Sequence, residues 1–252
     1  MAFLKDIAFH VDNLLRTHEC QDAASAHNGL QLENNSGEVM RIAAAVDACE
    51  AVIDHATQLE KTLLIVHHGL FWRKEQCLLG AVYRKFRTAI VGDLAIYSAH
   101  LPLDIHPEHG NNILLARACG FSNCHPFLEG VGCFVGVRAE VKLSRVDLLR
   151  RVEEAVGGSV HIASGGPAIC RHIGIISGAA GSKIAQAAAE GVDTLITGEG
   201  SHWTYIAAEE ARVNLIYAGH YATETLGVQS VAKHLSKCFS IPWQFIDHPS
   251  GR

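Results

Sequence analysis

Two adjacent histidines, His67 and His68, stand at the end of an apolar run, residues 63–66, and are followed by Gly69. An apolar run of this kind is typical of a buried strand and the glycine marks a loop, so the rings are expected at a strand end. Neutral imidazole nitrogens in such a position are ligands for Zn²⁺ and other transition metals. The pair alone is equally compatible with a structural role, in which one ring is packed and the other is solvated.

Two later segments supply further metal-binding residue types, because SAHLPLD contains His100 and Asp104, and AGHYATE contains His220 and Glu224. His220 and Glu224 are four residues apart, so they face the same way if a helix begins there. Pro102 lies between His100 and Asp104 and disfavours a helix, so that segment is expected to be a loop. Imidazoles and carboxylates together suit Zn, Mn, Fe, Co or Ni better than Ca or Mg.

Five motifs occur in order along almost the whole chain: HNGLQ (27–31), VHHGLFW (66–72), HLPLDIHPEHGNN (100–112), GVDTLITGE (191–199) and AGHYATE (218–224). In these motifs the sequence resembles the GTP cyclohydrolase 1 type 2 homologues, also called the NGG-interacting-factor-three-like family. The resemblance implies a centre of two divalent metal ions, Zn, Fe, Mn, Co or Ni, bridged by a carboxylate. The ligands that it implies are His67, His68, Asp104, His220 and Glu224, with Glu224 as the bridge.

The resemblance also implies a reaction, because the family name refers to opening of the guanine imidazole ring of GTP with release of formate. Two metal ions about 3.5–4 Å apart lower the pKa of a bound water and polarise a phosphoryl or imine group. Phosphoester hydrolysis needs the same nucleophile, so the sequence leaves open which nucleotide or phosphorylated small molecule is the substrate. A non-catalytic role as a metal-handling or regulatory scaffold is the alternative. The assembly that the resemblance implies is a homohexamer.

His100 and Glu199 are the candidate catalytic residues outside this ligand set. His100 lies close to Asp104 along the chain, so it can move a proton or bind substrate, and it can equally orient a ligand. Glu199, in TGEGSHW, follows another apolar run and is expected to line the same edge of the sheet. His202 in that motif is interpreted as a solvated loop residue.

Two neighbouring segments have structural interpretations that we favour over functional ones. Phe71 and Trp72 follow the histidine pair and are expected to pack in the core rather than to stack on a purine. The segment SGAAGSK, residues 177–183, follows a strand and opens a helix, which is where phosphates bind. It lacks the spacing of a P-loop, and tight turns account for its glycines, so phosphate binding is the lesser alternative.

The composition is that of a globular enzyme, with 252 residues, 48% hydrophobic and 19% charged. A formal net charge of −5 provides no basic field for nucleic acid or anionic lipid, so a small-molecule substrate is expected. Eight scattered cysteines include no CxxC pair, which argues against a zinc ribbon or a disulfide framework. No apolar run reaches transmembrane length and the amino end lacks a secretory h-region, so the cytoplasm is the expected location.

Strand-like and helix-like segments alternate along the chain, which is typical of an α/β protein. Strands are expected at 41–46, 62–66, 94–99, 134–143, 172–177, 194–197, 215–218 and 243–246, and helices at 49–60, 111–119, 182–190, 203–211 and 223–235. We predict two α/β lobes, with residues 106–189 inserted as the second lobe into a first lobe formed by residues 1–105 and 190–252. The metal site is expected in the cleft between the lobes, because ligands gather beyond the carboxyl ends of strands.

Overall fold

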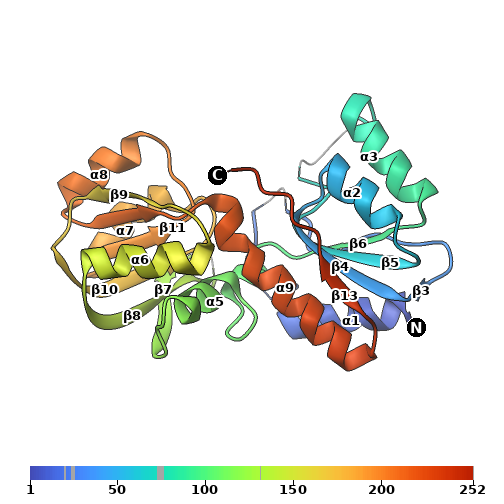
Figure 1. The fold of residues 1–252 in the computed structure, drawn as a ribbon, viewed down its shortest axis with the longest axis horizontal. Coiled ribbons are helices and arrows are strands. Elements are labelled where there is room, and N and C mark those ends of the chain that lie inside the picture. The colour runs from blue at the N-terminus through green and yellow to red at the C-terminus, as the bar shows by residue number, and fades with distance from the viewer. Residues whose placement is uncertain (20, 24–25, 73–76, 131, 252) are drawn as a thin grey trace. The chain divides into compact units, whose positions relative to one another are not determined.

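The computed structural model describes all residues of the chain except 20, 24–25, 73–76, 131 and 252. The chain forms two compact units, each of which is discontinuous in sequence (Figure 1). The first unit consists of Met1–Leu103 and Gly227–His248, and the second consists of Asp104–Leu226 with the last residues from Pro249. The expected α/β class is confirmed, since each unit is a sheet with helices packed against it.

The first unit is built on a five-stranded sheet in the order β13-β4-β5-β6-β2. Its parallel strands are β13 (Trp243–Phe245), β4 (Arg41–Asp47), β5 (Thr62–His68) and β6 (Ala95–Ser98), with β2 (Gly29–Leu32) antiparallel at the edge. β4 and β5 are buried along nearly their whole length, as parallel strands are when both faces of a sheet are covered. A separate antiparallel pair joins β1 (Ala2–Phe3) to β3 (Glu38–Val39).

Helices cover both faces of this sheet (Figure 1). They are α1 (Leu4–Leu15), α2 (Glu50–Thr57), α3 (Gly80–Val91) and the later part of α9 (His220–Phe239), a helix that begins in the second unit. Successive residues of β4 face opposite sides, so Ile42 packs in the core with α1 and α9, while Ala43 packs in the core with α2 and α3. Both faces are therefore apolar, and polar side chains collect at the ends of the strands.

The second unit has a six-stranded sheet in the order β7-β8-β10-β11-β12-β9. β10 (Ile169–Ile176), β11 (Thr194–Thr197) and β12 (Asn214–Tyr217) are parallel, while β7 (Cys124–Glu129), β8 (Phe134–Ser144) and β9 (His161–Ser164) are antiparallel to their neighbours. One core contains residues of α5 (Asn111–Ala118) and α6 (Arg145–Val156), and the other contains residues of α7 (Ile184–Ala189) and α8 (Trp203–Ala211). A short 3-10 turn, Gly181–Lys183, precedes α7.

The observed boundary between the units differs from the one expected at residue 190. β11 and β12 continue the parallel ladder that starts at β10, so residues 190–226 belong to the second unit and not to the first. The alternation of strands and helices is the same in both units, and it does not indicate which sheet a strand will join. Within the described residues, no helix has the length and apolar character needed to cross a membrane.

The segment between His100 and Asp104 is also different from the expectation, because Leu101–Ile105 forms a helix, α4, where a loop was expected. Pro102 is the second residue of this helix. Proline is tolerated in a first turn because the backbone N–H that it lacks has no helical acceptor there. The turn is closed instead by the N–H of Leu103, which donates to the carbonyl of His100 over 2.9 Å.

Candidate metal centre

Three histidines of the first unit meet at the carboxyl ends of two neighbouring parallel strands. His67 and His68 are the last residues of β5, and His100 follows β6 by two residues. Val66 pairs with Ser98 in the ladder, so the two strands end at the same edge. One ligand nitrogen of each ring lies within 4.8 Å of the others, and the rings of His67 and His100 have centroids 5.0 Å apart. The sheet thus presents a cluster of three imidazoles.

Each of these rings is held through Nδ1 by an oxygen that can only accept. Nδ1 of His67 donates to the carbonyl of Ala99 over 2.9 Å, and Nδ1 of His68 donates to Oδ1 of Asp47 over 2.8 Å. Nδ1 of His100 donates to Oδ1 of Asp22 over 2.8 Å. A proton on Nδ1 puts the lone pair of the neutral ring on Nε2, and outer hydrogen bonds of this kind fix ring tautomer and orientation in metal sites.

Asp22 fixes the position of His100 and of the chain that follows it. Besides the bond from His100, its carboxylate accepts hydrogen bonds from the N–H of Leu101 over 3.0 Å and from Nδ2 of Asn28 over 2.9 Å. Burial alone would raise the pKa of Asp22. The hydrogen bond and charge of His100, with the bonds from Asn28 and the N–H of Ala23, outweigh it and lower the pKa from 3.8 to about 2.

We expect Asp22→Asn to remove part of the acid dependence of stability in the metal-free protein. The pKa of Asp22 is lowered in the fold to about 2, so its contribution is complete above pH 3.8 and is lost as the pH falls towards 2. The shift corresponds to roughly 2 kcal/mol of unfolding free energy. Urea unfolding between pH 5 and pH 2 measures it, with the exposed Asp54→Asn as control. Identical pH profiles for wild type and Asp22→Asn would show that the pair does not stabilise the fold.

In the second unit, His220 lies between two carboxylates. It is the first residue of α9, and its Nε2 lies 3.1 Å from Oε1 of Glu224, one turn later in the helix. Its Nδ1 lies 3.1 Å from Oε1 of Glu199, in the loop that follows β11. The hydrogen bond to Glu224 contributes most to raising the pKa of His220 to about 9; burial opposes it, and the charge of Glu224 and the bond to Glu199 add to it.

The surroundings of His220 therefore favour a positive charge at Nε2. In the absence of a metal ion, a proton on Nε2 supplies this positive charge. A divalent cation is the natural replacement for that proton, because it binds a neutral imidazole and a carboxylate together. Glu224 is only 2% exposed, and burying a carboxylate is costly unless it is paired or bound to a cation. The donor set of His220 and Glu224 thus fits a metal ion.

Asp104 is held in a hydrogen-bond network of the second unit. Its Oδ1 accepts from Nδ2 of Asn111 over 2.8 Å and from Oγ of Ser177 over 2.8 Å. Ser177 follows β10, and its N–H donates to Oδ1 of Asn112 over 2.8 Å. The two asparagines at the start of α5 therefore fix the loop after β10 and, through it, the carboxylate of Asp104.

Gly178, the next residue of that loop, leaves the space in which the carboxylate of Glu224 lies. A Cβ at Gly178 would be 2.3 Å from Oε1 of Glu224 and 3.5 Å from Nε2 of His220. The residue also has φ +64°, a left-handed conformation that glycine adopts at little cost. Close packing thus explains the first glycine of segment 177–183, in agreement with the structural interpretation of that segment.

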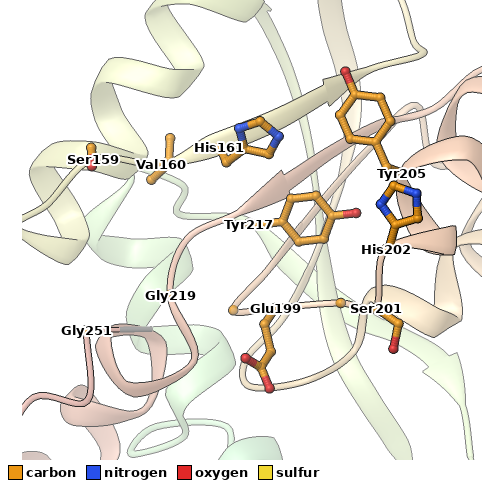
Figure 2. A pocket seen from close by; sticks show the side chains of 12 residues that line it. Ser159, Val160, His161, Glu199, Ser201, His202, Tyr205, Tyr217, Gly219 and Gly251 are labelled. Carbon is orange, nitrogen blue, oxygen red and sulfur yellow. The ribbon is translucent and has the colours of Figure 1, made fainter.

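A pocket of about 900 Å³ lies within the second unit, at the carboxyl ends of β11 and β12 (Figure 2). Tyr217 ends β12, and His161 begins the antiparallel β9, so both residues lie at this edge. The ring of His161 is 6.0 Å from that of Tyr217, with 20° between the planes, and 5.9 Å from that of Tyr205. Glu199, which holds His220, also lines the pocket, so the pocket adjoins a candidate metal ligand.

The family of the chain follows from a match over nearly its full length. Residues 2–250 match the family model described as Duf34/NIF3 (NGG1p interacting factor 3). The chain belongs to the Duf34/NIF3 family. This confirms the resemblance found in the sequence motifs.

Relatives of this Duf34/NIF3 protein support the assignment. A Deinococcus radiodurans protein named GTP cyclohydrolase 1 type 2 homolog is 40% identical over 226 residues, 89% of this chain and 86% of the relative. A Pseudomonas aeruginosa protein of the same name is 38% identical over 251 residues, 98% of each chain. The crystal structure of the protein TTHA1606 from Thermus thermophilus superposes with a TM-score of 0.91 at 35% identity, covering 100% of both chains.

In this Duf34/NIF3 chain, the sequence-predicted residues are distributed over the two units. The first unit groups His67 and His68 with His100, which the sequence placed only among the candidate catalytic residues. The second unit groups His220 and Glu224 with Glu199. Asp104 lies in the same unit, in the network that includes the loop of Gly178.

The sequence did not identify the residues that orient these side chains. Asp47 is the last residue of β4 and pairs with His68 in the ladder, so strand register could have revealed it. Asp22 lies in a loop 78 positions before His100, and no local pattern points to it. Phe71 packs against the core as expected, whereas Trp72 is 39% exposed and lies edge-on to His100 with centroids 4.8 Å apart. His202 is exposed, as expected, and lines the pocket.

Proposed function

We propose that this protein is a metal-dependent hydrolase that binds two divalent ions, Zn, Fe, Mn, Co or Ni. The proposed ligands are His67, His68, Asp104, His220 and Glu224. The observation that carries the proposal is that His67, His68 and His100 are each held through Nδ1 by an oxygen acceptor, which leaves Nε2 to bind a metal ion. The carboxylate beside Nε2 of His220 supports it in the second unit.

The chemistry that such ions supply when bound is the activation of a water molecule and the polarisation of the bond to be broken. The residues of the chain supply orientation. Asp47 and Asp22 hold the rings of His68 and His100, and Glu199 holds a proton on Nδ1 of His220. His100 lies beside His67 and His68, so its Nε2 is placed to exchange a proton with a substrate held at the ions that these two rings would bind.

We propose a nucleotide or a related phosphorylated molecule with an aromatic ring as the substrate. The relatives named GTP cyclohydrolase 1 type 2 homolog support this class, and so does the pocket beside Glu199. The rings of His161, Tyr205 and Tyr217 can receive a planar base, and Glu199 can accept a hydrogen bond from it. Ring opening and phosphoester hydrolysis remain the two candidate reactions.

Tyr205→Leu is expected to raise the KM for a substrate with an aromatic base by about 2- to 10-fold with little change in kcat, because aromatic contacts contribute about 0.5–1.5 kcal/mol. Tyr205→Phe keeps the ring and is expected to keep the KM of the wild type. Steady-state kinetics of the two variants make the comparison. A KM that is equally affected in both variants would mean that the hydroxyl group, and not the ring, binds the substrate.

The experiment that tests the function is a hydrolysis assay of metal-loaded protein against a panel of nucleotides and phosphoesters. We expect formate or phosphate release that His67→Ala abolishes. His125→Ala removes an exposed histidine of β7 and is expected to leave the activity unchanged. Activity that survives His67→Ala would contradict the proposal. Tight metal binding with no turnover on the whole panel would support a metal-handling or regulatory scaffold instead.

On the family resemblance we also propose a homohexamer. Light scattering of the purified protein measures the mass of the assembly. A monomer or dimer at micromolar concentration would contradict this part of the proposal.

A further inference from the structure

A second cluster of metal-binding side chains lies in the first unit, on α1 and the later part of α9. His10, His234 and Cys238 each present a ligand atom, and the three atoms lie within 4.8 Å of one another. Nε2 of His234 is 3.0 Å from Nε2 of His10 and 3.4 Å from Sγ of Cys238. None of these residues belongs to the proposed catalytic ligand set.

Packing of the two helices brings these side chains together. Leu4, Ile7 and Val11 of α1 are in the same buried core as Val231 and Leu235 of α9. The core contacts hold the two helices side by side, and His10 lies on the flank of α1 that borders α9. The ring of Phe239 meets that of His10 edge-on, with centroids 5.6 Å apart. The position of the histidine is therefore set by the fold.

The two residues of α9 are related by helix geometry. His234 and Cys238 are four positions apart and so project from the same face of the helix, one turn apart. Cys238 is exposed and both histidines are half-buried, which leaves the cluster open to solvent. An ion can therefore reach it from solution.

Hydrogen bonding alone does not account for this arrangement well. A ring nitrogen of histidine carries either one proton or one lone pair, so it makes one good hydrogen bond. Nε2 of His234 nevertheless lies at contact distance from two partners, a nitrogen and a sulfur. A cation between the three atoms would accept an electron pair from each of them at once.

We propose that His10, His234 and Cys238 form a binding site for one Zn²⁺ ion, with a water or an external ligand in the fourth position. Zn–N bonds of about 2.0–2.1 Å and Zn–S bonds of about 2.3 Å in a tetrahedron place two nitrogens about 3.3 Å apart and a nitrogen and a sulfur about 3.6 Å apart. The observed separations, 3.0 Å and 3.4 Å, are within a few tenths of an ångström of these values. Imidazole with thiolate is also a donor set that Zn²⁺ prefers.

The thiolate distinguishes this site from the proposed catalytic centre, whose ligands are nitrogens and oxygens only. Co²⁺ replaces Zn²⁺ in tetrahedral sites and has a thiolate-to-metal charge-transfer absorption in the near ultraviolet when sulfur is a ligand. We expect this absorption on adding Co²⁺ to the reduced protein. It is expected to disappear in Cys238→Ser and to persist in Cys77→Ser, which removes another exposed cysteine of the same unit.

A metal count provides a second measurement. Equilibrium dialysis with Zn²⁺ is expected to give one ion fewer per chain for Cys238→Ser than for Cys77→Ser. His10→Gln, which removes a ligand from the other helix, is expected to weaken Zn²⁺ binding at this site at least 10-fold. The absence of the charge-transfer absorption at saturating Co²⁺, or its persistence in Cys238→Ser, would overturn the proposal, whatever the hydrolysis assay shows.

Discussion

Glu224→Gln is expected to lower the hydrolytic rate of the metal-loaded protein by at least about 100-fold, since changes in residues that only orient metal ligands already cost about 10- to 100-fold. Gln has the size of Glu but no charge, so the substitution removes the negatively charged oxygen beside Nε2 of His220. The pKa of His220 is raised chiefly by the hydrogen bond to Glu224, so the substitution should also lower that pKa.

The measurements for Glu224→Gln are the turnover rate and the metal content after dialysis. Glu209→Gln is the matched control, because Glu209 is an exposed carboxylate of α8 in the same unit. We expect the control to keep both values. A Glu224→Gln protein with full metal content and full activity would exclude Glu224 as a ligand.

Gly178→Ala is the second substitution with a large expected effect. An added Cβ would lie 2.3 Å from Oε1 of Glu224, so the carboxylate must move away from its place beside His220. The substitution also puts alanine in a left-handed conformation, at φ +64°. We expect metal affinity to fall at least 10-fold, in addition to a loss of roughly 1–2 kcal/mol of stability from the backbone strain.

Gly191→Ala separates the two effects. Gly191 has φ +80° in the same unit, and beyond its own chain neighbours no atom of the described residues lies within 4 Å of the Cβ that alanine would add. Gly191→Ala therefore introduces the backbone strain without a contact with Glu224. Urea unfolding is expected to show the loss from backbone strain in both variants and a further loss in Gly178→Ala, where the buried Glu224 is displaced. Metal titration is expected to show a loss only in Gly178→Ala. Equal metal affinities in the two variants would mean that the place of Glu224 does not matter for binding.

The order of strands and helices could be predicted from the sequence, whereas their assignment to sheets could not. The apolar runs that became β4, β5, β10 and β11 are evident because parallel strands covered on both faces are almost entirely apolar. A run of this kind carries no information on its neighbours in the sheet. The stretch 190–226 was therefore assigned to the wrong unit, although its strands and helix were correctly expected.

The candidate site could likewise be predicted only in part from the sequence. His67 and His68 were recognisable because they are adjacent and follow a strand. Asp47, which orients His68, ends another strand, and Asp22, which orients His100, lies in a distant loop. Only the folded chain brings these carboxylates to the rings. His100 was recognised, but its place in a cluster with the other two imidazoles depends on the parallel pairing of β5 and β6.

The most direct test of the central claim is anomalous diffraction from crystals of the protein loaded with Zn²⁺ or Mn²⁺. We expect two ions at the proposed centre, with Nε2 of His67 and the carboxylate of Glu224 among their ligands at about 2.0–2.3 Å. At saturating metal, the absence of any ion within bonding distance of these two residues would contradict the account.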